Sequence, residues 1–339
     1  MRLNSLSPGT GAALLIACGM MLASGLPRAP DLPPGPWQVR ATRSVIATRD
    51  GPYRILVWRP EGKTGRRPLI LYAPGWGDRG EAGSRQLAYL ASHGYVAVAF
   101  DDLARDPPRA GESPADAALR HAAFDEATPR AYAASFTLAG RRVQKAADKG
   151  RAILDAVLAS PDLAAQIDPA RIGFLGFSFG GATAVEQAIA DPRIKAVINL
   201  DGWLFGEASR RVLARPYLLF YIDDDFPPAG WSTRSDPGQR ALAQACAVDR
   251  AIHRPYLGRA DFVWLHARHV SHEDLSGAWP GWSWKHPFAP MDDDRQALAA
   301  RQAAHAQIVR AFLDRYLLDQ NRAFPPAGQT YPGDISAMN

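Results

Sequence analysis

The pentapeptide G-F-S-F-G, from Gly176 to Gly180, is the feature that most limits what this chain can fold into. It ends a short apolar run that begins at Ile172, and a helix-forming segment follows it at once. A G-x-S-x-G sequence between a strand and a helix is typical of a nucleophile elbow, a turn so sharp that the serine hydroxyl is exposed. The two glycines remove side chains that would collide with the neighbouring strand and helix. Ser178 is therefore the predicted nucleophile, although a glycine-rich strand-to-helix turn with an incidental serine has the same pattern.

Apolar runs and helical patterns alternate along the rest of the chain. The runs that predict strands are residues 44–47, 53–59, 68–73, 95–100, 172–177, 194–200, 217–222 and 262–267. The segments that predict helices are residues 84–92, 131–159, 179–190, 237–251 and 296–318. Strands that alternate with helices build a mostly parallel sheet covered on both faces, so the predicted fold class is α/β.

The chain shows no repeat, no low-complexity block and no interdomain linker after residue 40. We therefore expect a single domain over residues 41–320, followed by a C-terminal tail at residues 321–339. Residues 103–130 are polar, rich in proline and weakly patterned. A loop of this length inside a compact domain is usually functional or mobile, so this segment is expected to be an insertion or a lid.

The N-terminus has the pattern of an export signal. Arg2 precedes an apolar run at residues 11–25, which is too short to span a bilayer, and a proline-rich spacer occupies residues 26–40. A charged start, a short apolar core and small residues before the spacer describe a secretory signal peptide over residues 1–25 and a periplasmic or secreted protein. The alternative is a lipoprotein, because Leu15-Ile16-Ala17-Cys18 resembles a lipobox that would leave Cys18 as a lipidated N-terminus.

The composition limits which partners and which disulfides are expected of this chain. The chain carries 39 basic and 34 acidic side chains, and the basic ones are scattered rather than clustered, so we expect no nucleic-acid partner. If the signal peptide is removed, Cys18 is lost with it and one cysteine, Cys246, remains. An intrachain disulfide is then excluded.

A serine nucleophile needs a histidine base, which in turn needs an acid to orient it. On this type of fold the chain order is Ser, acid, His. His269 and His272 both follow the last predicted strand, where catalytic loops gather, and His272 has the better position. The acid has two candidates, because Asp201 and Asp223 each end a predicted strand. The residues alone do not choose between them, and the triple acid at 223–225 could equally be a solvated turn.

Two segments resemble the platelet-activating-factor acetylhydrolase family of α/β-hydrolases. Residues 176–183, GFSFGGAT, are similar to the elbow GHSFGGAT of that family, and residues 200–205, LDGWLF, are similar to its LDAWMF. The aspartate of that second motif is the family's triad acid, so the resemblance implies that Asp201 has this role. The family's histidine opens an HQNF-like segment after the last strand, which implies that His272, in HEDL, is the base.

The resemblance also implies an oxyanion hole. The family's oxyanion loop, HGLG, is matched by residues 74–77, PGWG, so the backbone N–H groups of Trp76 and Phe179 are the implied donors. Pro74 and Phe177 stand where the family has histidines, and residues 103–130 and 276–292 have no counterpart in it. The dienelactone-hydrolase-like group, which has the same α/β-hydrolase fold, is also similar.

Tryptophans mark the expected substrate-binding surface. Trp203 lies two residues after Asp201, and Trp279 and Trp282 belong to an aromatic, proline-rich segment after His272. Such a segment suits an apolar wall for an acyl group or a rim in peripheral contact with a membrane, and it would also suit a loop anchored on the core.

Together these features predict a serine carboxylic ester hydrolase that acts through an acyl-enzyme on small or lipid-like esters. Its chemistry requires neither a metal nor an organic cofactor. The alternatives are a dienelactone-hydrolase-like enzyme with another substrate class, or a non-catalytic binding protein on the same scaffold.

Overall fold

The computed structural model describes residues 32–62, 65–109, 111–276, 293–318, 324 and 335–338. The expected signal peptide, the alternative lipidation site at Cys18, and both Trp279 and Trp282 lie outside the described residues. Within the described part of the chain, no helix is long and apolar enough to cross a membrane.

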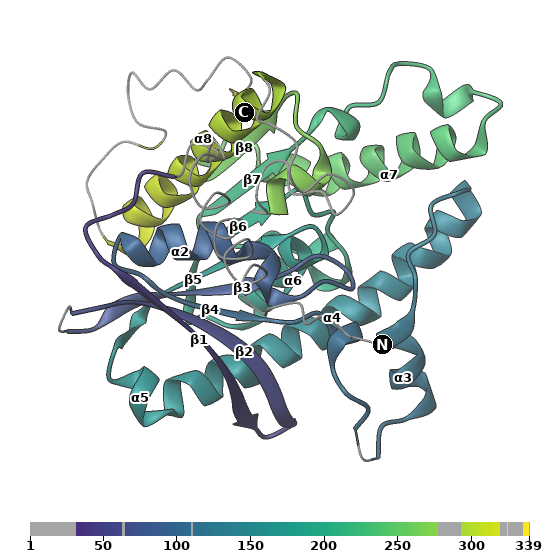
Figure 1. Cartoon of the computed structure of the whole chain (residues 1–339). Helices are drawn as coiled ribbons and strands as arrows, with labels where there is room; N and C mark the ends of the chain where they lie inside the picture. The colour runs from purple at the N-terminus through teal and green to yellow at the C-terminus, as the bar shows by residue number, and fades with distance from the viewer. Residues whose placement is uncertain are drawn as a thin grey trace, which may run out of the picture.

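A nine-stranded sheet forms the centre of the molecule, with the strand order β1-β2-β4-β3-β5-β6-β7-β8-β9 (Figure 1). The strands are β1 Val39–Thr48, β2 Gly51–Pro60, β3 Arg67–Ala73, β4 Val96–Phe100, β5 Ile167–Phe177, β6 Ile194–Leu200, β7 Tyr217–Tyr221, β8 Phe262–Ala267 and β9 Ile335–Ala337. From β4 to β8 in this order all neighbours are parallel, whereas β1, β2 and β9 join as antiparallel strands. The prediction of a mostly parallel α/β sheet in one domain is thus confirmed.

Helices cover both faces of this sheet (Figure 1). Helices α2 Ser84–Ser92 and α8 Asp293–Leu317 contribute to the core on one face. Helices α4 Pro129–Ala159, α6 Phe179–Ala190 and α7 Pro237–His253 pack on the other face. The central strands are mostly apolar because they are buried on both sides; β3, for example, is buried at every residue.

Short elements connect these layers. Two further helices are α3 Pro114–His121 and α5 Pro161–Ala164. The 3₁₀ helices are η1 Gly80–Gly83, η2 Leu103–Arg105, η3 Gly206–Ser209, η4 Asp223–Asp225, η5 Trp231–Thr233, η6 Arg254–Tyr256 and η7 His272–Ser276.

The segment 103–130 is more ordered than its sequence suggested. It contains η2 and α3, so the expectation of an unpatterned loop is wrong for this part of the segment. Helix α3 begins with its own local signals, because Ser113 accepts a hydrogen bond from the backbone of Asp116 and Pro114 occupies the first turn. Eight residues are too few for a clear hydrophobic period, which is why the pattern was weak.

The C-terminal segment also contributes to the sheet. Within residues 321–339, which were expected to be a tail, Ile335–Ala337 form β9 and pair with β8.

Candidate active site

The nucleophile elbow forms where β5 meets α6. Ser178 has φ 53° and ψ −127°, a strained conformation for a residue with a side chain. A Cβ added to Gly176 would collide with the carbonyl of Gly180, and a Cβ added to Gly180 would collide with the carbonyl of Ala73. Both glycines of the motif are therefore required by the close approach of strand and helix. The Ser178 N–H donates to the Leu200 carbonyl of the neighbouring strand at 2.8 Å, which holds the turn in place.

Two backbone N–H groups lie beside the elbow. Phe179 is the first residue of α6, and Trp76 follows β3 in the loop that starts with Gly75. Neither backbone N–H has an acceptor among the described residues. The ring centroids of Trp76 and Phe179 are 4.7 Å apart, and the Trp76 indole N–H donates to the Ala122 carbonyl at 3.0 Å. This arrangement suits an oxyanion hole, because unpaired N–H groups at a helix start can receive developing negative charge.

An aspartate–histidine pair completes the site. His272 Nδ1 lies 2.6 Å from Asp201 Oδ2. Asp201 ends β6 with φ 58°, and Asn199 holds this turn through hydrogen bonds with both the N–H and the carbonyl of Gly202. The imidazole packs on the Phe177 ring with centroids 4.7 Å apart. Burial lowers the pKa of His272, so the ring is neutral at neutral pH and can accept a proton.

The alternative candidates, Asp223 for the acid and His269 for the base, make other contacts. Asp223 contacts His266 Nε2 at 2.8 Å and accepts from the His269 backbone N–H at 3.0 Å. Asp223 is exposed, whereas Asp201 is buried. The structure therefore places Asp201, and not Asp223, against His272.

Asp225 is a member of the site that the sequence did not single out. Its carboxyl accepts from the Trp203 indole N–H at 3.0 Å and from the Ile222 backbone N–H at 3.0 Å, and the neighbouring Asp201 carboxyl acts on it electrostatically. It is 5 % exposed, so the interpretation of residues 223–225 as a solvated turn is wrong for this residue. Burial and the neighbouring Asp201 raise the pKa of Asp225 to about 8, while burial raises the pKa of Asp201 to about 6.

Arg142 is a second residue that the sequence did not single out. Its side chain is fully buried in α4, and its guanidinium lies 4.3 Å from the Trp76 ring centroid and 5.5 Å from that of Phe179. It donates to the Asp102 carboxylate and to the carbonyls of Leu119 and Arg120. The signal available in the sequence was its position on the apolar stripe of a predicted helix, where a basic residue is unusual.

Ser178, Asp201, His272, Trp76, Phe179 and Trp203 all line one cavity of about 400 Å³. Phe124 and Glu126, from the segment 103–130, close another side of it. The remaining lining residues are Phe205, Ile222, Asp224, Asp225 and Leu242. The aromatic walls touch one another, since Phe124 lies 5.9 Å from Trp76 and 6.3 Å from Trp203 between ring centroids. The cavity is thus largely apolar, with its polar groups gathered around Ser178.

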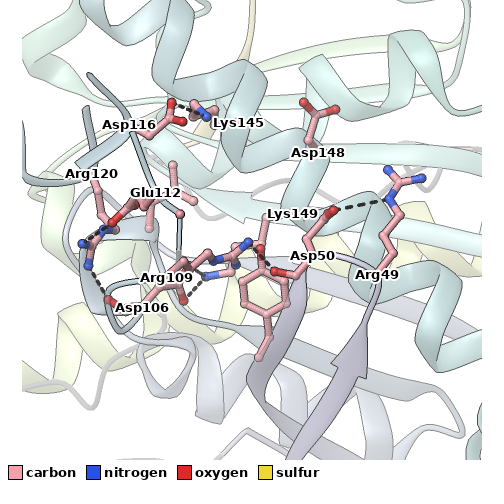
Figure 2. Close-up of a pocket in the computed structure, with 13 residues that line it drawn as sticks. Arg49, Asp50, Asp106, Arg109, Glu112, Asp116, Arg120, Lys145, Asp148 and Lys149 are labelled. Carbon is pink, nitrogen blue, oxygen red and sulfur yellow. Dashed lines mark hydrogen bonds and ion pairs between the residues drawn. The ribbon is translucent and has the colours of Figure 1, made fainter. Parts of the chain in front are cut away.

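A larger cavity of about 530 Å³ contains none of these residues (Figure 2). Its basic and acidic side chains are mostly paired with each other, for example Lys149 with Asp106 and Arg120 with Glu112. Among the residues that the structure describes, no group of three or more His, Cys, Asp or Glu side chains is arranged to hold a metal ion.

Comparison with known proteins finds similarity to hydrolases and esterases. Residues 57–215, somewhat less than half of the chain, match the model of the dienelactone hydrolase family. A platelet-activating factor acetylhydrolase from Cavia porcellus is 27 % identical over 189 residues, which is 50 % of this chain and 43 % of that protein. A probable 1-alkyl-2-acetylglycerophosphocholine esterase from Arthroderma benhamiae is 39 % identical over 71 residues, which is 19 % of this chain and 18 % of that protein.

This chain thus spans less than half the length of the curated relatives it matches. Among solved structures, a ferulic acid esterase from Streptomyces cinnamoneus aligns with a TM-score of 0.59 and 21 % identity, over 92 % of this chain and 98 % of that one. The likeness extends over nearly the whole molecule and establishes the fold. The chain has an α/β-hydrolase fold and is similar, over part of its length, to acetylhydrolases and an esterase.

Proposed function

We propose that this chain is a carboxylic ester hydrolase that acts through an acyl-enzyme on Ser178. The observation that carries the proposal is the His272–Asp201 pair, with 2.6 Å between Nδ1 and Oδ2, in the cavity that Ser178 lines from a strained elbow. The names of the matched relatives and of the structural neighbour, all of which are esterases or acetylhydrolases, support the same reaction class.

The chemistry follows from these positions. His272 takes the proton from Ser178 Oγ as that oxygen attacks the ester carbonyl, and Asp201 holds the imidazole in the required tautomer. The N–H groups of Trp76 and Phe179 stabilise the oxyanion, each donor contributing about 3–4 kcal/mol to the transition state. His272 then gives its proton to the leaving alcohol. Water enters, and the same groups hydrolyse the acyl-enzyme.

The substrate class follows from the cavity. A volume of about 400 Å³ with aromatic walls suits the apolar acyl group of a small or lipid-like ester. The pattern of residues 1–25 supports export, so we place the enzyme in the periplasm or outside the cell.

Active-site labelling tests the function directly. The wild-type protein should react with a fluorophosphonate probe and hydrolyse 4-nitrophenyl acetate. The Ser178→Ala variant should lose the label and about 10⁴-fold or more of kcat, with a residual rate from the oxyanion hole. Ser44→Ala is the matched control, because Ser44 is exposed on β1, away from the cavity. Wild-type protein that is neither labelled nor active would favour a binding protein, and full turnover by Ser178→Ala would show that Ser178 is not the nucleophile.

A further inference from the structure

The cavity beside Ser178 has an unusual combination of side chains. Aromatic rings form its walls, namely Trp76, Phe124, Phe179, Trp203 and Phe205. Four carboxyl groups also line it, namely Glu126, Asp201, Asp224 and Asp225. Its described lining residues include no lysine or arginine, although the whole chain has a formal net charge of +5.

The other large cavity shows that this bias is local. There, arginines and lysines stand among an equal number of acidic residues around the rim (Figure 2). The charge of the cavity at Ser178 is therefore not a general property of the surface.

Two basic side chains that contact residues of the catalytic cavity already have partners. Arg142 stacks on Trp76 but does not line the cavity, and its guanidinium donates to the Asp102 carboxylate. Arg250 donates to the backbone carbonyl of Asp225. Neither is placed to neutralise an anionic group on a bound substrate.

An anionic substrate group would therefore be poorly accommodated. A carboxylate that enters the cavity loses its water, finds no cationic partner among the described lining residues, and lies near ionised carboxylates. A cationic substrate group, in contrast, is attracted by the cavity. The ring faces attract it through cation–π interaction, and the exposed carboxylates of Glu126 and Asp224 attract it through Coulomb interaction.

We propose that this site hydrolyses esters whose acyl group is uncharged or carries an alkylammonium, and rejects esters whose acyl group carries an anion. The inference rests on the proposed esterase function and defines the charge class of its substrates.

Isosteric 4-nitrophenyl esters test the selectivity. The hemisuccinate is compared with the neutral 4-methylpentanoate, and the 4-(trimethylammonio)butanoate is compared with the neutral 5,5-dimethylhexanoate. We expect kcat/KM for the hemisuccinate to be at least about 100-fold below that of its isostere, after subtraction of the uncatalysed rate. The cationic ester should equal or exceed its isostere, by up to about fivefold. A hemisuccinate rate within threefold of its isostere would overturn the proposal.

A charge-reversal variant tests the cause. Glu126→Arg places a cation at the cavity, so the ratio of hemisuccinate to 4-methylpentanoate hydrolysis should rise by about tenfold. Asp148→Arg makes the same charge change on an exposed residue that lines the other cavity, and it should leave the ratio unchanged, since salt screens distant surface charges. An unaltered ratio in Glu126→Arg would show that charge is not the basis of selection.

Failure of the esterase function and failure of the charge selectivity give different experimental results. If no ester is hydrolysed and Ser178 is not labelled by the fluorophosphonate, the esterase function itself is wrong. If neutral esters are hydrolysed and Ser178 is labelled, but the charged esters are not distinguished, only the substrate class is wrong.

Discussion

Asp201 and Asp225 form a pair of buried carboxyl groups whose side chains contact no lysine or arginine in the described part of the chain. Two like charges this close do not ionise together, so the pair retains a proton over part of the pH range. The pKa of Asp225 is the higher of the two, at about 8, against about 6 for Asp201. At neutral pH, Asp225 therefore carries the proton, and Asp201 remains the carboxylate that orients His272. The ionisable groups around the pair are His272, Asp224, Asp249, Cys246, Arg250 and Glu126.

This pair makes stability depend on pH. The pKa of Asp225 is raised above its unfolded value of 3.8, so the folded protein binds the proton more tightly, and the resulting stability is lost as pH rises toward about 8. The free energy of unfolding, measured in urea between pH 5 and 8, should fall with rising pH. In Asp225→Asn the slope should be shallower by up to about 1.4 kcal/mol per pH unit. Equal slopes in the two proteins would show that Asp225 is ionised in the folded state.

The choice of triad acid gives a sharp contrast between two similar substitutions. Asp201→Asn should lower kcat by about 10⁴-fold, because an amide at this position favours the wrong imidazole tautomer of His272. Asp223→Asn should leave kcat nearly unchanged, since Asp223 contacts His266 and the His269 backbone instead. Steady-state kinetics with a 4-nitrophenyl ester distinguish the two, and the reverse result would assign the acid to the end of β7.

Helix α4 connects the segment 103–130 to the loop that holds Trp76. Arg142 contacts the Trp76 and Phe179 rings on one side and the carbonyls of Leu119 and Arg120 on the other. Seven residues later on the same helix, Lys149 forms a similar buried pair with Asp106 and donates to the Asp101 carbonyl. The two basic residues are comparable in burial and differ in what they touch.

That difference allows a matched test. Arg142→Met and Lys149→Met each break a buried ion pair, and each should cost about 3–5 kcal/mol of stability. Only Arg142→Met should also lower kcat, by about tenfold or more, because Trp76 loses the group that positions its loop. Activity is measured at a temperature at which circular dichroism shows both variants folded, with Arg142→Lys as the charge-conserving variant. An equal loss of kcat in Lys149→Met would reduce the role of Arg142 to general stability.

Across the whole molecule, the sheet brings residues from distant parts of the chain to one edge. Trp76, Ser178, Asp201, Asp225 and His272 follow β3, β5, β6, β7 and β8, and the carboxyl ends of parallel strands meet at the same side of a sheet. The antiparallel strand β9 then covers the outer edge of β8, the strand that leads to His272.

Removal of β9 should leave the outer edge of β8 unpaired. A chain that ends at residue 332 lacks β9, and we expect it to aggregate and to unfold several degrees below the full chain. Ile335→Ala keeps the backbone pairing and removes only a buried side chain, so its effect should be smaller. Size-exclusion chromatography and thermal denaturation measure both effects. A truncated chain as soluble and as stable as the full chain would show that β9 is dispensable.

The elbow, the alternation of strands and helices and the site candidates were predictable because their causes are local. Gly176 and Gly180 are needed wherever a strand turns this sharply into a helix, and the apolar period of each segment depends only on its own residues. The order Ser178, Asp201, His272 is likewise a property of the chain. The sequence by itself therefore determined the fold class and reduced the acid to two aspartates, of which the family resemblance favoured Asp201.

The tertiary structure decided what depends on distant contacts. Asp201 and Asp223 both follow neighbouring parallel strands, and only the path of the chain after β8 determines which carboxylate meets His272. Burial of Asp225 against Trp203, and of Arg142 against Trp76, brings together residues from separate elements. The hydrophobic periodicity of the sequence does not predict such contacts. The burial of a charged side chain depends on the partners that surround it in space rather than on its neighbours in sequence.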